Sequence, residues 1–177
     1  MVIFNPAFLE TRLPTSDMVL LEEDFQTIRD LIQKLRNEAN ARIVCLVDRN
    51  GQQIASVGDV QGLDVTALAS LTAGNVAATD SLARLIGEKD FSTLYHEGEK
   101  DNLHLSMVGG KVILVVIFDE RSSLGLVRLR VKKHAGELGA ALEKMQQRSS
   151  KARSGKAAAA SPFTDITDED IDSLFSE

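Results

Sequence analysis

The spacing of apolar side chains predicts three helices. Apolar residues recur every three or four positions over residues 18–37, which predicts a first helix with one buried face. The same spacing predicts a second helix over 65–86, with Asp64 as its N-terminal cap and Gly87 just beyond its end. A third helix is predicted over 132–147.

Shorter runs of β-branched and apolar residues predict five strands. They cover residues 43–47, 53–57, 103–108, 112–118 and 124–131. Asn50-Gly51 joins the first two as a hairpin, because both residues tolerate positive φ, and Gly109-Gly110 does the same for the next pair. The run at 112–118 is apolar on both faces, so we expect a central strand that is covered on both sides. The run at 124–131 alternates apolar residues with arginines, as a half-buried strand does.

This order of elements predicts an α+β domain. Helix, two strands, helix, three strands and helix give a five-stranded, mostly antiparallel sheet. We expect one folded domain over 18–147, preceded by an N-terminal extension over 1–17. Residues 148–160 are rich in Arg, Lys, Ser, Gly and Ala, which predicts a flexible basic linker. Residues 161–177 follow as an acidic C-terminal segment.

Charge is distributed unevenly along the 177 residues, whose net charge is −6. The segment 161–177 holds six acids and no base, and 148–160 holds four bases and no acid. The remainder is nearly balanced, which argues against a nucleic-acid partner, because such proteins usually carry a basic face. A single cysteine, no visible secretory signal and a longest apolar run of seven residues predict a soluble, cytoplasmic chain without a membrane partner.

No catalytic or metal-binding motif stands out. Gly109-Gly110-Lys111-Val112 resembles a phosphate loop but lacks a following Ser or Thr, so a hairpin turn explains it better. His96, His104 and His134 lack metal-ligand spacing, and Cys45 fits a buried structural thiol. The acids of 168–172 imitate the start of a calcium loop, but the chain ends before a twelfth ligand. We therefore expect neither a metal nor a cofactor.

The second helix carries a stripe of small residues. At about 100° per residue, the stripe contains Ser70, Gly74, Ala77 and Ser81. A different face holds the large residues Leu68, Leu71, Leu82, Leu85 and Ile86. Because a helix usually buries its large face first, we expect the small stripe to contact a twin helix or a partner protein. The alternative is that the stripe packs tightly within its own subunit.

The C-terminal segment has an apolar edge as well as its acids. The apolar residues are Phe163, Ile166, Ile171, Leu174 and Phe175. A helix this short is unstable alone, but it can fold into a groove on a partner. A solubilising tail is the alternative, although such a tail has no need for these apolar side chains. We therefore favour a docking helix.

Several segments resemble a known family. They are CLVDRNG at 45–51, LASLTAGNVAA at 68–78, LVVIFD at 114–119 and SLGLVRLR at 123–130. Together with the acidic end at 168–177, they resemble the roadblock/dynein light-chain family, with the roadblock domain over 18–147. Within that family, the resemblance is to bacterial regulators of a Ras-like polarity GTPase of the MglA type.

The resemblance implies a homodimer in which the second helices and edge strands meet and the two sheets become one. It implies a GTPase-activating protein without an active site of its own, acting on one GTPase that carries the GTP and Mg²⁺. The dimer would supply no arginine finger and would reposition the GTPase's own catalytic residues, while the C-terminal segment assists nucleotide exchange. It further implies a role in gliding motility, other polarity proteins as partners, and enrichment at a cell pole.

The resemblance also implies roles for particular residues. Ala77 and Ser81 would contact the GTPase, with Thr27, Lys132 and Lys133 as weaker candidates. The same stripe would meet its twin across the dimer at Ser70 and Gly74, and the five apolar residues of the C-terminal segment would dock on the GTPase.

One residue departs from the pattern, and other interpretations remain. Asp80 places a charge where the family has small residues. The chain could instead be a scaffold that recruits partners without affecting GTP turnover. Arg84 or Arg121 could also act as an inserted finger, which would contradict the account without one.

Overall fold

The α+β prediction is confirmed in the computed structural model, which describes residues 22–157. Its elements are α1 (Glu22–Glu38), β1 (Ile43–Asp48), β2 (Gln53–Gly58), α2 (Val65–Leu85), β3 (Thr93–His96), β4 (Asn102–Val108), β5 (Val112–Phe118) and α3 (Leu124–Ala157). The predicted extension at 1–17 and the apolar residues predicted to dock in 161–177 lie outside the described residues.

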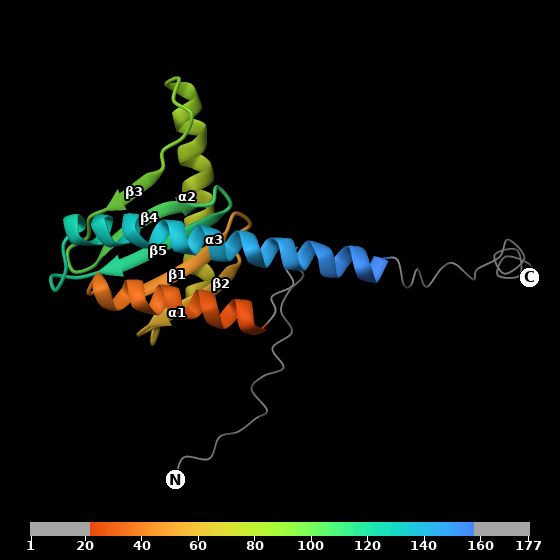
Figure 1. Cartoon of the computed structure of the whole chain (residues 1–177). Helices are drawn as coiled ribbons and strands as arrows, with labels where there is room; N and C mark the ends of the chain where they lie inside the picture. Colours follow the sequence, from red (N-terminus) through yellow and green to blue (C-terminus); the bar gives the residue numbers. More distant parts are fainter. Residues whose placement is uncertain (1–21, 158–177) are drawn as a thin grey trace, which may run out of the picture.

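The five strands form one antiparallel sheet in the order β2-β1-β5-β4-β3. β5 lies at the centre, as predicted, and all its side chains except that of Ile117 are buried. Figure 1 shows α1 and α3 on one face of the sheet and α2 on the other. Each face has its own apolar core, one formed with α1 and α3 and the other with α2.

The strand predicted over 124–131 is wrong, because these residues form the start of α3. Val127 and Val131 lie four residues apart on the buried side of the helix, whereas Leu129 is 61% exposed. The Ser123 hydroxyl accepts a hydrogen bond from the Leu126 N–H at 3.3 Å, which satisfies one free N–H at the helix start. The apolar residues thus fit both a helical and an alternating pattern, and packing against α1 selects the helix.

The fifth strand is β3, which the apolar pattern does not reveal. It has four residues and, among the described strands, pairs only with β4, so it forms one edge of the sheet. The Tyr95 ring packs near Phe118, with centroids 6.4 Å apart, and its hydroxyl donates to Asn102 Oδ1 at 3.0 Å. Tertiary contacts therefore stabilise a strand that is too short to be recognised from periodicity.

Helix α3 is longer than predicted and runs through residues 148–157, where a flexible linker was expected. It lies antiparallel to α1, because Arg148 pairs with Asp24 at 3.1 Å near one end and Lys133 pairs with Glu38 at 2.9 Å near the other. Figure 1 shows the last part of α3 extending beyond the sheet.

Glu38 joins the end of α1 to α3. Its carboxylate lies 2.9 Å from Lys133 Nζ, 3.2 Å from His134 Nε2 and 3.5 Å from Arg130 Nη1. The hydrogen bond from Lys133, together with the His134 ring beside it, lowers the pKa of Glu38 to about 2. The carboxylate therefore stays ionised and paired with Lys133 and Arg130 over the physiological pH range.

The Asn50-Gly51 turn forms the predicted hairpin and also touches α2. The Asp48 carboxylate accepts hydrogen bonds from the N–H groups of Asn50 and Gln52, at 2.9 and 2.8 Å, which fixes the turn. Gly51 has φ +82°, and a Cβ on it would lie 2.9 Å from the Ser70 Cα of α2. Glycine is thus required both by the turn and by the close approach of the helix.

Two buried groups on the strands are consistent with a structural role. Cys45 is fully buried in β1, and burial raises the pKa of its thiol to about 11. His104 in β4 is 1% exposed, and burial lowers the pKa of its imidazole to about 4, with a smaller contribution from Arg128. The prediction that His104 belongs to the sheet and not to a metal site is consistent with its burial.

We expect Gly51→Ala to destabilise the fold more than Gly62→Ala. Both glycines have positive φ, and an alanine there costs about 1–2 kcal/mol. A Cβ at Gly62 meets nothing within 4 Å, whereas one at Gly51 meets the backbone of α2, which adds about 1–3 kcal/mol of overpacking. Urea unfolding of both variants measures the difference. Equal losses would show that the turn does not limit how closely α2 packs.

We expect His104 to make the fold sensitive to acid. Its pKa is lowered from 6.5 to about 4, so the unfolded chain binds the proton more tightly. The associated stability is fully present above pH 6.5 and is lost as the pH falls towards 4, by about 3 kcal/mol for a shift of this size. In His104→Leu, the free energy of unfolding should depend less on pH between 6.5 and 4. The exposed His96→Leu is the control, and an unchanged slope in His104→Leu would contradict the assignment.

Candidate functional site

The buried side of α2 consists of small and medium-sized residues. They are Ala69, Thr72, Ala73, Val76 and Ala83. The expectation that the large face packs on the sheet is therefore wrong. Exposure reaches 73% for Leu71, 53% for Leu82, 83% for Leu85 and 63% for Ile86. We call these four residues the apolar ridge. A helix that lies close to a sheet has room only for short side chains beneath it.

The small stripe of α2 is exposed in the single chain, as predicted. Its members Ser70, Gly74, Ala77 and Ser81 all face solvent. Among the described residues, a Cβ on Gly74 would meet nothing within 4 Å, so this part of the stripe does not pack against residues 22–157 of its own subunit. The stripe runs between the apolar ridge on one side of the helix and a cavity on the other.

That cavity, which we call the α2 cavity, has a volume of about 290 Å³. Its floor is apolar and consists of Ala73, Val76, Ala77 and Ile113. Its rim is polar and consists of Arg49, Asp80, Ser81 and Arg84. Two residues predicted to contact a GTPase, Ala77 and Ser81, thus line one cavity. An apolar floor with a charged rim suits the recognition of a protein side chain.

Hydrogen bonds organise the rim. Arg49 donates from Nε to the Gly110 carbonyl at 3.2 Å and from Nη1 to Asp80 at 3.3 Å. The Asp80 charge is therefore paired, although it departs from the small residues expected at this position. On the other side, Arg84 donates to the Ser81 hydroxyl at 3.1 Å, and that hydroxyl donates to the Ala77 carbonyl at 3.1 Å.

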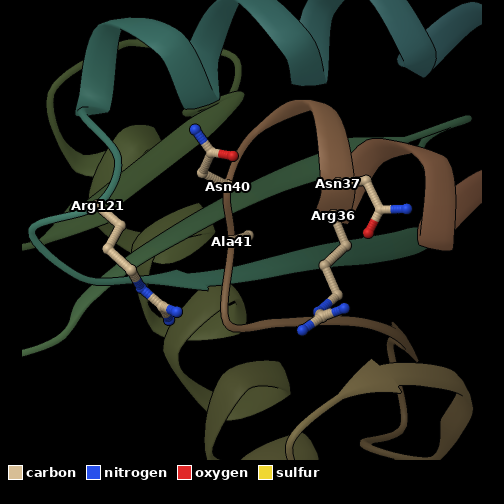
Figure 2. A pocket seen from close by; sticks show the side chains of 5 residues that line it. All are labelled: Arg36, Asn37, Asn40, Ala41 and Arg121. Carbon is tan, nitrogen blue, oxygen red and sulfur yellow. The ribbon is translucent and has the colours of Figure 1, made fainter.

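A second cavity, of about 460 Å³, lies at the far end of the sheet (Figure 2). Arg36 and Arg121 flank the segment that contains Ala41. Arg121 binds both carboxylate oxygens of Asp119 at 2.8–3.1 Å, which raises the pKa of the guanidinium and lowers that of the carboxyl. To act as an inserted finger, Arg121 would have to break this pair. Arg84, in contrast, lies on the rim of the α2 cavity.

The apolar ridge is continuous with the edge of the sheet. The Asn75 side chain of α2 lies 3.1 Å from His96 Nε2 at the end of β3. β3 is an edge strand, and Phe91 just before it is 37% exposed. Apolar side chains and a free strand edge therefore share one surface.

Comparison with known families identifies the fold. The Roadblock/LC7 domain model matches residues 27–118, which is more than half of the chain. The chain belongs to the Roadblock/LC7 family. No curated protein gives a significant sequence match. In the described residues, no helix is long and apolar enough to cross a membrane, and no group of three His, Cys, Asp or Glu side chains could hold a metal ion.

Solved structures of MglB proteins resemble this roadblock chain. Myxococcus xanthus MglB is 54% identical, with a TM-score of 0.68, and the match covers 72% of this chain and 96% of that one. The gliding protein MglB of Thermus thermophilus is 31% identical, with a TM-score of 0.68 and coverages of 74% and 99%. An MglB with a tetrameric arrangement is also 31% identical, with a TM-score of 0.69 and coverages of 75% and 99%.

The weaker candidates of the roadblock resemblance lie on the other face of the sheet. Thr27 is exposed on α1, and its hydroxyl donates to the Glu23 carbonyl at 2.9 Å. Lys132 and Lys133 are exposed on α3, where Lys133 pairs with Glu38. Within one chain, the fold does not bring these three residues to the α2 cavity.

Arg49 is a rim residue that the sequence pattern does not reveal, although the pattern predicts the turn next to it. Arg49 follows β1 directly, and it reaches Asp80 across 31 residues of sequence. The signal available was the Asn50-Gly51 turn beside it, but the contact of that turn with α2 depends on how the helix crosses the sheet.

Proposed function

We propose that this roadblock chain is a homodimeric GTPase-activating regulator of a Ras-like GTPase of the MglA type, with a role in gliding motility. The family and the similarity to MglB proteins support a GTPase regulator at the level of the family. The observation that carries the finer proposal is the exposed small stripe of α2 beside the α2 cavity. Small residues allow the backbone of a partner to come close, and the cavity can accept one of its side chains.

Such a surface accelerates hydrolysis by holding the switch segments of the GTPase. Phosphoryl transfer depends mainly on the position of the attacking water and on charge stabilisation around the phosphates. A rigid helix can fix a mobile switch segment so that the GTPase's own arginine and glutamine reach the nucleotide. The GTP and Mg²⁺ belong to the GTPase, and the pairing of Arg121 with Asp119 supports a mechanism without a finger from that residue.

The dimer forms through the apolar ridge and the edge strand β3. Four large apolar side chains exposed on one helix are unusual for a monomer and are typical of an interface. Pairing of two β3 edges would join the two sheets into one and satisfy the free backbone groups of the edge. Ser70 and Gly74 lie beside the ridge, where a twin helix can approach closely.

The segment 161–177 docks on a separate surface of the bound GTPase and assists nucleotide exchange. Its apolar residues, Phe163, Ile166, Ile171, Leu174 and Phe175, make the contact. The rival proposal is a scaffold that binds partners through the same helix without changing GTP turnover. Single-turnover hydrolysis by the cognate GTPase separates the two, because only the regulator accelerates the reaction.

We expect Ser81→Arg and Ala77→Arg to weaken binding of the GTPase at least tenfold and to abolish its activation. Each places a long cation on the small stripe, where a partner must approach closely. Ala140→Arg on the exposed side of α3 is the control, because it adds the same side chain away from α2. The measurements are a binding titration and single-turnover GTP hydrolysis. Wild-type activation by either stripe variant would show that this surface is not the interface.

We expect Leu85→Asp to convert the dimer to a monomer. The change buries a carboxylate in the proposed interface without a partner, which costs several kcal/mol. Leu129→Asp is the matched control, because Leu129 is 61% exposed on α3, on the other face of the sheet. Light scattering after gel filtration gives the mass of each variant. If Leu85→Asp remains dimeric, the ridge does not form the interface.

A further inference from the structure

The α2 cavity has a surplus of positive charge around it. Arg49 and Arg84 lie on its rim, against the single carboxylate of Asp80. Lys111 extends the basic surface, because it lies in the same turn as Gly110, which binds Arg49. The floor between these groups is apolar and has no charged side chain. The chemistry of the cavity therefore suits an apolar side chain flanked by carboxylates.

The C-terminal segment 161–177 has this composition. It holds six acids and no base, with apolar side chains interspersed among the acids. The run from Asp168 to Phe175 places four acids around Ile171 and next to Leu174 and Phe175. The rim arginines and this segment are thus complementary in charge, and the apolar floor matches its apolar side chains.

The chain is long enough to bring the segment to the cavity. Lys111 Nζ donates to Gln146 Oε1 at 3.0 Å, so α3 passes beside the turn that also contacts Arg49. From Gln146 to Ala157 the helix continues for about 16 Å, at about 1.5 Å per residue. Eight extended residues from 158 span about 26–29 Å, at about 3.3–3.6 Å each. The acids from Asp165 onward can therefore return to the α2 cavity.

The other arginine-lined cavity fits this segment less well. It lies at the opposite end of α3, where the Ser122 hydroxyl bonds the Ala39 carbonyl. From there to the end of α3 is about 50 Å of helix, at about 1.5 Å per residue, so only the last few residues of the chain could reach it. Its Arg121 is also already paired with Asp119.

We propose that residues 161–177 fold back onto the α2 cavity of their own chain and cover it until a partner displaces them. The acids pair with Arg49 and Arg84, and an apolar side chain enters the floor. Because the segment is tethered, its effective concentration at the cavity is on the order of millimolar, so weak contacts suffice. The identity of the displacing partner as a GTPase rests on the proposed function, but the docking itself does not.

This arrangement gives the segment two successive positions. In the free protein it shields the small stripe and the apolar floor from other proteins. When the GTPase takes the α2 cavity, the segment is released and becomes available for a second contact on the GTPase. A partner must compete with the segment, so the cover lowers its apparent affinity and favours partners that fit the cavity well.

A spin label at the end of the full chain tests the docking. Ser176→Cys accepts the label, whereas Cys45 is buried in β1 and stays unmodified. In low salt, without any GTPase, we expect the label to broaden the amide signals of Arg49, Ala77 and Ser81 to less than half their intensity. Raising the NaCl concentration to about 0.5 M should restore most of that intensity, because salt screens exposed charges.

Charge reversal supplies matched variants of the labelled chain. Arg49→Glu with Arg84→Glu should abolish the broadening, because the rim then repels the acids. Arg29→Glu with Lys34→Glu makes the same change in net charge on exposed positions of α1, on the other face of the sheet, and should leave the broadening intact. The proposal would be overturned if the labelled chain with its native rim showed no broadening at the cavity. It would also be overturned if the two double variants showed equal broadening.

Association with the GTPase separates this inference from the proposed function. We expect a chain that ends at Ala160 to bind the GTPase several-fold faster than the full chain, with the same sensitivity to Ser81→Arg. If the spin label shows docking but the GTPase does not bind, the proposed function fails and the docking stands. If the GTPase binds and the amides of the cavity show no broadening, the docking fails and the proposed function stands.

Discussion

The close approach of α2 to the sheet is the constraint on which the functional face depends. The side of the helix that meets the sheet carries mainly alanines, and the β1–β2 turn meets the helix backbone at Gly51. A larger side chain at either place would push the helix away. Because the buried side is made of short side chains, the leucines of α2 remain on the outside. The packing of the short side of α2 against the sheet thus produces the apolar ridge, the exposed small stripe and the cavity beside it.

The two faces of the sheet differ in how much apolar surface their helices bury. On one face, α1 and α3 bury the larger core, and ion pairs join these two helices at both ends. The pair with Lys133 holds the pKa of Glu38 well below its ordinary value. On the other face, α2 buries mainly short side chains and leaves four large apolar ones exposed, which is the basis for the proposed interface. The central strand β5 supports both faces, so a rigid core lies directly beneath the proposed interface.

The charged side chains on the α2 face affect which partners can approach more than they affect the stability of the fold. Arg49 serves both the turn carbonyl of Gly110 and the Asp80 carboxylate, so the rim of the cavity is organised before a partner arrives. Exposed pairs of this kind contribute little to folding, typically below about 1 kcal/mol. Their larger effect is on which charges can approach. A rim with a surplus of arginine favours acidic partners, whether these are in another protein or in the chain's own C-terminal segment.

The sequence by itself determined the order of helices and strands outside residues 93–96 and 124–131, the hairpins at Asn50-Gly51 and Gly109-Gly110, the central position of β5 and the small stripe of α2. These follow from local periodicity and turn chemistry, which short stretches of chain encode. Only the tertiary structure decided that residues 124–131 are helical, that β3 is the fifth strand, and that the leucines of α2 face outward. Residues 124–131 fit two local patterns, β3 is too short to show one, and either face of α2 could have met the sheet. Contacts between residues far apart in the chain decided all three. The pairing of Arg49 with Asp80 was likewise decided by the tertiary structure, because no local sequence pattern shows which loop α2 passes as it crosses the sheet.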